Sequence, residues 1–117
     1  MMGQIEEHYD RGVAYKTEGK YDEAVAEFRA ILEICSENSE AHRQIGLVYG
    51  FLGLFDESLE ELLKAVALDG DNVTARNDLA LTYAMLGMVD EAKAEFETVL
   101  SMDPANDVAQ KNLVYFS

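Results

Sequence analysis

Side chains that could bind a metal or act as a nucleophile are scarce in this chain of 117 residues. It has two histidines, His8 and His42, and a single cysteine, Cys35. Two histidines without a third ligand do not make a zinc site, so we interpret both as packing residues. No serine or cysteine has a histidine at a spacing that suggests a catalytic dyad, and no glycine-rich phosphate loop occurs. We therefore expect a non-enzymatic protein that uses no metal and no cofactor.

Acidic residues could offer another metal chemistry, because hard cations prefer several oxygen ligands. The stretch DGDNVTARNDLA, residues 69–80, begins like a calcium-binding loop. Thr74 stands where that loop needs a glycine, and Ala80 stands where it needs a bidentate glutamate. We therefore interpret this stretch as a turn, and the other acidic clusters as solvated helix faces. Cys35 ends an apolar helical stripe and is expected to be buried.

The overall charge narrows the choice of partners. Nine Lys and Arg residues are outnumbered by 23 Asp and Glu residues, which gives a formal net charge of −14 at pH 7. Such a chain repels phosphate backbones and anionic membranes, so we expect neither nucleic acid nor membrane as a partner. A cationic segment would associate faster. The first residues lack the features of a signal peptide, and no apolar run approaches the roughly 20 residues of a membrane helix, so we expect a cytoplasmic protein.

The sequence is built on an internal repeat. The segment GKYDEAVAEF, residues 19–28, returns as GLFDESLEEL at 53–62 and as GMVDEAKAEF at 87–96. A constant spacing of 34 residues is typical of stacked repeat proteins. The predicted units are residues 5–38, 39–72 and 73–106.

Each unit is predicted to contain two helices. Apolar residues at helical spacing, such as Ile45, Val48 and Leu52, precede a glycine, and a second apolar series of the same spacing follows it. That glycine, Gly53 in the second unit, suits the left-handed conformation that ends a helix. The Asp-Glu pair after it favours the start of the second helix, because carboxylates stabilise the positive end of the helix dipole.

These residues resemble the tetratricopeptide repeat, a family with small and aromatic residues at fixed places in each unit. The matching residues are His8, Arg11, Gly12, Tyr15, Ala24 and Phe28; His42, Ile45, Gly46, Tyr49, Ser58 and Leu62; and Arg76, Leu79, Ala80, Tyr83, Ala92, Phe96 and Pro104. The resemblance implies an all-α, right-handed superhelical solenoid of three helix-turn-helix repeats, with residues 107–117 as a partial C-terminal capping helix. Residues 1–117 would form a single domain.

The resemblance also implies a concave groove, lined by the first helix of each repeat, that binds an extended peptide or a helix. The candidate groove residues are Tyr9, Val13, Arg43, Gln44, Leu47, Phe51, Asn77, Leu81 and Met85. The apolar members are expected to anchor a partner segment. Gln44 and Asn77 are expected to hydrogen-bond its backbone, and Arg43 to select its charge. Alternatively, some of these side chains tighten the packing between neighbouring first helices.

Some members of this family hold the C-terminal carboxylate of chaperones with a basic clamp, and this chain lacks it. The clamp positions correspond to Tyr9, Val13, Gln44, Thr74 and Asp78. Asp78 would repel a terminal carboxylate. We therefore predict a protein interaction scaffold with a protein or peptide partner, and a basic segment is the favoured ligand. The alternative is a self-associating structural module, a weak homo-oligomer whose groove or C-terminal end is filled by another copy.

Overall fold

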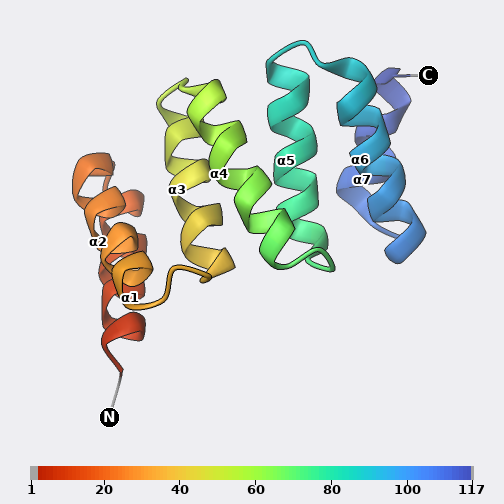
Figure 1. Ribbon diagram of the computed structural model, residues 1–117. Helices are drawn as coiled ribbons and strands as arrows, with labels where there is room; N and C mark the ends of the chain where they lie inside the picture. Colours follow the sequence, from red (N-terminus) through yellow and green to blue (C-terminus); the bar gives the residue numbers. More distant parts are fainter. Residues whose placement is uncertain (1–2, 117) are drawn as a thin grey trace.

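The computed structural model describes residues 3–116 and consists of an array of antiparallel helices (Figure 1). The elements are α1 (Gln4–Thr17), α2 (Tyr21–Ile34), α3 (Ser39–Phe51), α4 (Phe55–Leu68), α5 (Val73–Met85), α6 (Val89–Met102), α7 (Asp107–Leu113) and the 3-10 turn η1 (Val114–Phe116). Every regular element in the described range is helical, which confirms the predicted all-α class. Helices α1 to α6 form three pairs, one for each repeat, and α7 follows as a partial fourth unit.

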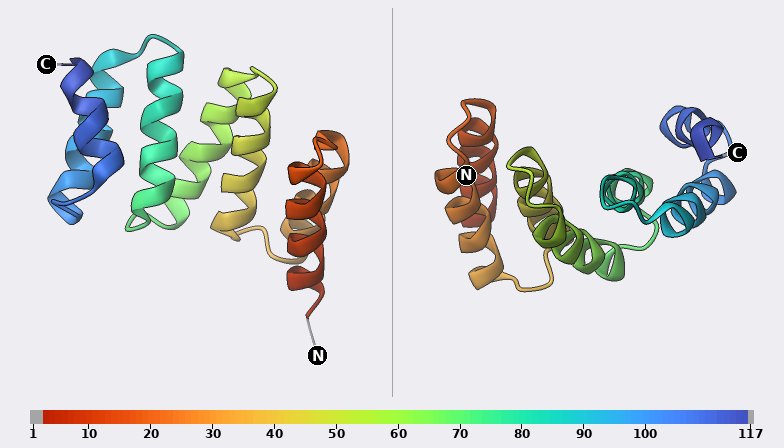
Figure 2. Two further views of the ribbon diagram at one scale, coloured as in Figure 1. Left: turned by 180° about the vertical axis from the view of Figure 1, so that it is seen from behind. Right: turned by 90° about the horizontal axis from the view of Figure 1, so that it is seen from above.

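The pairs stack side by side into a right-handed superhelical solenoid, as the sequence predicted. Seen from above, the array curves, with α1, α3, α5 and α7 on its inner side and α2, α4 and α6 on its outer side (Figure 2). Each helix packs mainly on its partner and on the adjoining helix of the next repeat. The first helices therefore line the concave surface. The assignment of residues 1–117 to one domain remains a prediction.

A glycine ends the first helix of each repeat. Gly19, Gly53 and Gly87 have positive φ angles of 78°, 76° and 76°. The N–H of the residue after each glycine donates to the carbonyl five residues earlier, at 2.8 to 2.9 Å, which closes the helix end. A side chain with a Cβ would be strained in this backbone conformation, so the recurrence of glycine has a direct structural cause.

An asparagine begins the first helix of each following unit. Asn38, Asn72 and Asn106 each accept a hydrogen bond from the backbone N–H three residues later, at 2.9 to 3.1 Å. A second side chain in the same helix binds a backbone carbonyl of the preceding loop, at 2.7 to 3.3 Å. These contacts join His42 to Ser36, Arg76 to Gly70 and Gln110 to Pro104. Because the same contacts recur in every loop, successive repeats meet in the same way.

The centre of each helix pair is filled by one large apolar side chain of the second helix. Phe28, Leu62 and Phe96 are fully buried. A Cβ placed on Gly12 would lie 2.6 Å from the ring of Phe28, and one placed on Gly46 would lie 2.9 Å from Leu62. The paired helices therefore approach each other closely, and glycine is what permits this in the first two repeats.

The C-terminal segment covers the third repeat, as expected. Ala109 is buried in one core cluster with Phe96, and Leu113 and Phe116 pack against that cluster. The rings of Phe96 and Phe116 stack with their centroids 6.2 Å apart. The helix itself ends at Leu113, so the cap is shorter than the predicted range of 107–117 and continues as the 3-10 turn. Over residues 3–116, none of the helices combines the length and apolar character needed to cross a membrane.

Two expectations about chemically versatile residues need correction. Cys35 is exposed, because the buried face of α2 ends at Ile31, and the helix itself ends at the exposed Ile34. The histidines contact the second helix of their repeat, but through carboxylates rather than through apolar packing. His8 Nδ1 lies 2.7 Å from Glu27, and His42 Nδ1 lies 3.0 Å from Glu61. In the third repeat the equivalent contact joins Arg76 to Glu95 at 3.0 Å.

Candidate functional site

An apolar cleft lies between α3 and α5 and is also lined by residues of α4. Its volume is about 140 Å³. Its walls are Gly46, Leu47, Gly50, Phe51, Phe55, Ser58, Leu62, Asp78, Leu81, Thr82 and Met85. Phe51 and Met85 are 61% and 62% exposed, although both are large apolar residues. Water-exposed apolar side chains around a cleft favour burial by a ligand, because burying apolar surface is the main driving force of association.

A second cleft, of about 330 Å³, lies between the first and second repeats. It is lined by Ile5, Glu6, Tyr9, Asp10, Ile31, Asn38 and Glu40. Three of these residues are apolar or aromatic and three are carboxylates. The ring of Tyr9 is held in place by an edge contact with the buried Phe28, at a centroid distance of 6.1 Å. This combination suits a lysine or arginine side chain, whose long stem is apolar and whose head is cationic.

A polar cluster separates the two clefts. Lys16 Nζ donates to Gln44 Oε1 at 2.6 Å, and Gln44 Nε2 donates to the Tyr9 hydroxyl at 3.4 Å. Arg43 donates to Asp78 at 2.7 Å and to Glu40 at 2.8 Å. These contacts tie α1, α3 and α5 together. They also balance two cations against two carboxylates, so the middle of the concave face carries little net charge.

Burial changes the acidity of this cluster. It raises the pKa of Asp78, although the neighbouring Arg43 guanidinium opposes that rise. Burial also lowers the pKa of Lys16, and the positive charge of Arg43 lowers that pKa further. For Arg43 the effect of burial is downward, but hydrogen bonds to Glu40 and Asp78 outweigh it and raise the pKa. The two ion-pair contacts of Arg43 therefore offset the cost of holding its charge in a half-buried place.

The structure brings together four of the predicted groove residues, Leu47, Phe51, Leu81 and Met85, around the cleft between α3 and α5. Tyr9 lines the other cleft. Val13 lines neither cleft and packs against the core of the first repeats. This places Val13 with the alternative of helix packing that the sequence left open.

The polar residues of the predicted groove already have partners inside the chain. Arg43 and Gln44 belong to the polar cluster, and Gln44 is only 4% exposed. Asn77 is 6% exposed, and its side-chain amide donates to the side chain of Asn106 at 3.0 Å. Its amide oxygen Oδ1 is buried and has no hydrogen-bond partner among residues 3–116. Their predicted contacts with a peptide remain predictions, and each would require an existing hydrogen bond to be shared or broken.

Sequence reasoning missed several residues of the two clefts. Phe55 stands at the first position of α4, and Ile31 belongs to α2, so neither lies on a first helix. In the second cleft Tyr9 was a predicted groove residue, whereas Ile31 was not, because it belongs to the second helix of its repeat. Among residues 3–116, no group of three or more His, Cys, Asp and Glu side chains is arranged to hold a metal ion.

Comparisons with known proteins agree with this architecture. Two tetratricopeptide repeat family models match the chain, one over residues 5–38 and the other over residues 52–114. A search of curated proteins gave no match.

Solved structures give the same fold. The first TPR of Spaghetti (RPAP3), bound to the HSP90 peptide SRMEEVD, is similar with a TM-score of 0.91 and 25% identity over 97% of this chain and 90% of that one. The second TPR domain of human RPAP3, in complex with the HSP70 peptide SGPTIEEVD, is similar with a TM-score of 0.89 and 27% identity over 97% and 94%.

An enzyme also contains a similar array. An O-GlcNAc transferase mutant of Thermobaculum terrenum matches with a TM-score of 0.87 and 22% identity, over 99% of this chain but 23% of that one. At that identity the likeness concerns the fold alone. Since a family model covers more than half of the residues and the solved structures share the whole helical array, the chain belongs to the tetratricopeptide repeat family.

Proposed function

We propose that this protein is a non-enzymatic, cytoplasmic interaction scaffold whose concave groove binds a segment of a partner protein. An apolar side chain of that segment enters the cleft between α3 and α5, and a lysine or arginine enters the cleft between α1 and α3. The observation that carries the proposal is the exposed apolar cleft formed by Leu47, Phe51, Leu81 and Met85. Its support from relatives is that similar TPR domains are solved with chaperone peptides.

The charge of the groove argues for a ligand unlike those peptides. SRMEEVD and SGPTIEEVD both end in acidic residues. In this chain Glu40 and Asp78 are paired with Arg43, so the negative charge beside the clefts comes mainly from Glu6 and Asp10. Like charges facing each other across an interface disfavour binding. We therefore expect a basic or neutral segment, and we expect SRMEEVD not to bind.

The test uses peptides selected from a random display library on the immobilised protein, with binding measured by fluorescence anisotropy. Leu47→Glu should weaken the selected peptides at least tenfold, because a carboxylate would line an apolar wall. The matched control is Leu63→Glu on the outer helix α4, where Leu63 is exposed and lines neither cleft. Equal weakening by both variants, or a selection dominated by acidic peptides, would refute the proposal.

A further inference from the structure

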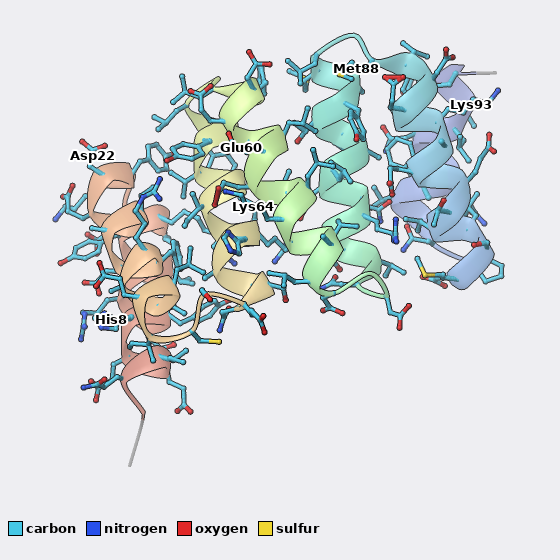
Figure 3. The ribbon with its side chains drawn as sticks, viewed as in Figure 1. His8, Asp22, Glu60, Lys64, Met88 and Lys93 are labelled. Carbon is cyan, nitrogen blue, oxygen red and sulfur yellow. The ribbon has the colours of Figure 1, made fainter. Side chains whose placement is uncertain are left out.

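The turns that join the two helices of each repeat differ sharply in polarity. All three turns lie along the same long edge of the array, which is the upper edge in Figure 1. In the first repeat this turn contains Glu18 and Lys20, which form an ion pair at 3.4 Å. In the second and third repeats the same positions are apolar. Figure 3 shows Met88 beside the turn between α5 and α6.

Six residues of the second and third repeats make up this surface, which we call the apolar turn edge. They are Phe51, Leu52, Leu54, Met85, Met88 and Val89. Every one of them is more than a third exposed, including Leu54 at 41% and Met88 at 37%. Leu54 and Met88 directly precede α4 and α6, and neither side chain makes a capping hydrogen bond. Their apolar character therefore serves no visible role in starting these helices.

Carboxylates border the apolar turn edge. Asp56 and Glu57 occupy the first turn of α4, and Asp90 and Glu91 occupy the first turn of α6. All four are exposed, and neither Lys nor Arg occurs between Gln44 and Leu63 or between Asn77 and Ala92. An apolar row bounded by negative charge is complementary to an apolar stripe bounded by positive charge.

We propose that the apolar turn edge binds the apolar face of a basic amphipathic helix from another protein. Two neighbouring turns of the array carry these apolar side chains (Figure 1), and the apolar stripe of such a helix would cover both. The bordering carboxylates would face its lysines or arginines. They also disfavour an anionic membrane surface, and the net charge of −14 on each chain disfavours a second copy.

This inference rests on the proposed function, because Phe51 and Met85 belong both to the edge and to the cleft between α3 and α5. Leu54 and Met88 line neither cleft, so they separate the two proposals experimentally. Replacing them with serine removes apolar surface without removing a hydrogen bond. Lys20→Ser is the matched control, since Lys20 holds the same position before α2 and also makes no capping hydrogen bond.

The probe is a fluorescent peptide of about 14 residues, near the length at which an isolated helix is marginal, with leucine and lysine at amphipathic helical spacing. We expect it to bind, to shift the backbone amide resonances of residues 51–55 and 85–89, and to lose at least tenfold in affinity with the double variant Leu54→Ser, Met88→Ser. Lys20→Ser should bind normally. A peptide with glutamate in place of lysine, or with the same residues in scrambled order, should bind at least tenfold more weakly.

Four results would overturn the inference. The first is unchanged affinity in the double variant with shifts confined to Leu47 and Leu81, which would leave the groove proposal intact. The second is no binding of the peptide to the wild-type protein. The third is a wild-type dimer, by light scattering, that the double variant converts to monomer. The fourth is binding of the protein to phosphatidylcholine vesicles that the double variant abolishes, which would assign the edge to a lipid surface.

Discussion

Gly12 and Gly46 approach the second helix of their repeat so closely that even a methyl group would collide with a buried side chain. Gly50 lies in the same helix as Gly46 but has room for a methyl group, since an added Cβ would meet the Ser58 hydroxyl at 3.7 Å, an ordinary van der Waals contact. The two environments predict opposite effects of the same substitution, because glycine in a helix costs backbone entropy wherever a methyl group is tolerated.

We predict that Gly12→Ala destabilises the protein by about 1–2 kcal/mol, because overpacking typically costs 1–3 kcal/mol and alanine returns up to about 1 kcal/mol of helix propensity. Gly50→Ala should instead raise the free energy of unfolding by about 0.5–1 kcal/mol. Urea denaturation followed by circular dichroism measures both. A Gly12→Ala variant as stable as Gly50→Ala would show that the first helix pair can spread without cost.

The carboxylate of Glu27 predicts how the stability of the protein depends on pH. Its pKa is lowered, mainly by the hydrogen bond from His8 and further by Arg11, although burial works in the opposite direction. A carboxylate with a depressed folded-state pKa adds stability above its unfolded pKa, and that stability is lost as the pH falls through the folded value.

We expect the titration midpoint of the Glu27 carboxyl carbon, followed by NMR, to lie below the ordinary 4.5 of glutamate. His8→Ala should raise that midpoint, because Arg11 alone remains as a partner. In His8→Ala the free energy of unfolding should also fall less as the pH is lowered through the range in which Glu27 is protonated. A midpoint that does not move in His8→Ala would remove the histidine from this interaction.

Among the three asparagines that cap helices, Asn106 has an additional hydrogen-bond partner. Asn38 and Asn106 both accept a backbone N–H at the start of the following helix. Asn106 also accepts from the buried side chain of Asn77 at 3.0 Å. Removing Asn106 would therefore leave two donors without their partner instead of one.

Asn38→Ala should cost about 1 kcal/mol, the usual value of a helix N-cap. Asn106→Ala should cost at least about 1 kcal/mol more, because the buried amide of Asn77 loses its acceptor. Thermal and urea unfolding of the two variants measures the difference. Equal losses would mean that water replaces Asn106 as the acceptor.

The helices and their order could be predicted from the sequence because each depends on neighbours within one repeat. Gly53 marked the turn between the two helices of the second repeat, and the 34-residue period marked the equivalent turns at Gly19 and Gly87. The polar cluster could not be predicted, since Arg43 meets Asp78 across 35 positions of sequence and only through the stacking angle of α3 and α5. Cys35 was misjudged because the buried face of α2 ends at Ile31 and Ile34 is already 48% exposed.

Leu47, Phe51, Leu81 and Met85 come together around one cleft because a regular period assigns each to the inner face of a first helix. Their role in binding a partner stays a prediction. The binding roles of Gln44 and the other polar candidates remain predictions. Side-chain type cannot show whether a polar group is free for a ligand, because that depends on its partners in the folded chain.

The whole molecule is an elongated array, 46 × 27 × 21 Å, in which each unit depends on its neighbours for burial. The unit at the C-terminal end has one short helix, α7, over the third repeat. Its inner face covers Phe96 and Val99, which are fully buried. Its outer face shows large side chains to solvent, including Tyr115 at 83% exposure.

Deleting residues 107–117 should therefore expose the core of the third repeat and cause aggregation or a large fall in melting temperature. An isolated helix of this length is unstable, so the segment persists only through its packing on α6. We also expect weak, concentration-dependent self-association of the intact protein through this end. Tyr115→Ser should reduce that self-association with little change in the melting temperature, because the side chain contributes to the outer surface and not to the core.

Light scattering over a range of concentrations, with thermal melting of the intact protein, the deletion and Tyr115→Ser side by side, checks both expectations. A deletion that stays monomeric with an unchanged melting temperature would mean that the third repeat is stable without α7. Such a result would be hard to reconcile with the stacked rings of Phe96 and Phe116. Self-association that Tyr115→Ser leaves unchanged would place the contact elsewhere on the molecule.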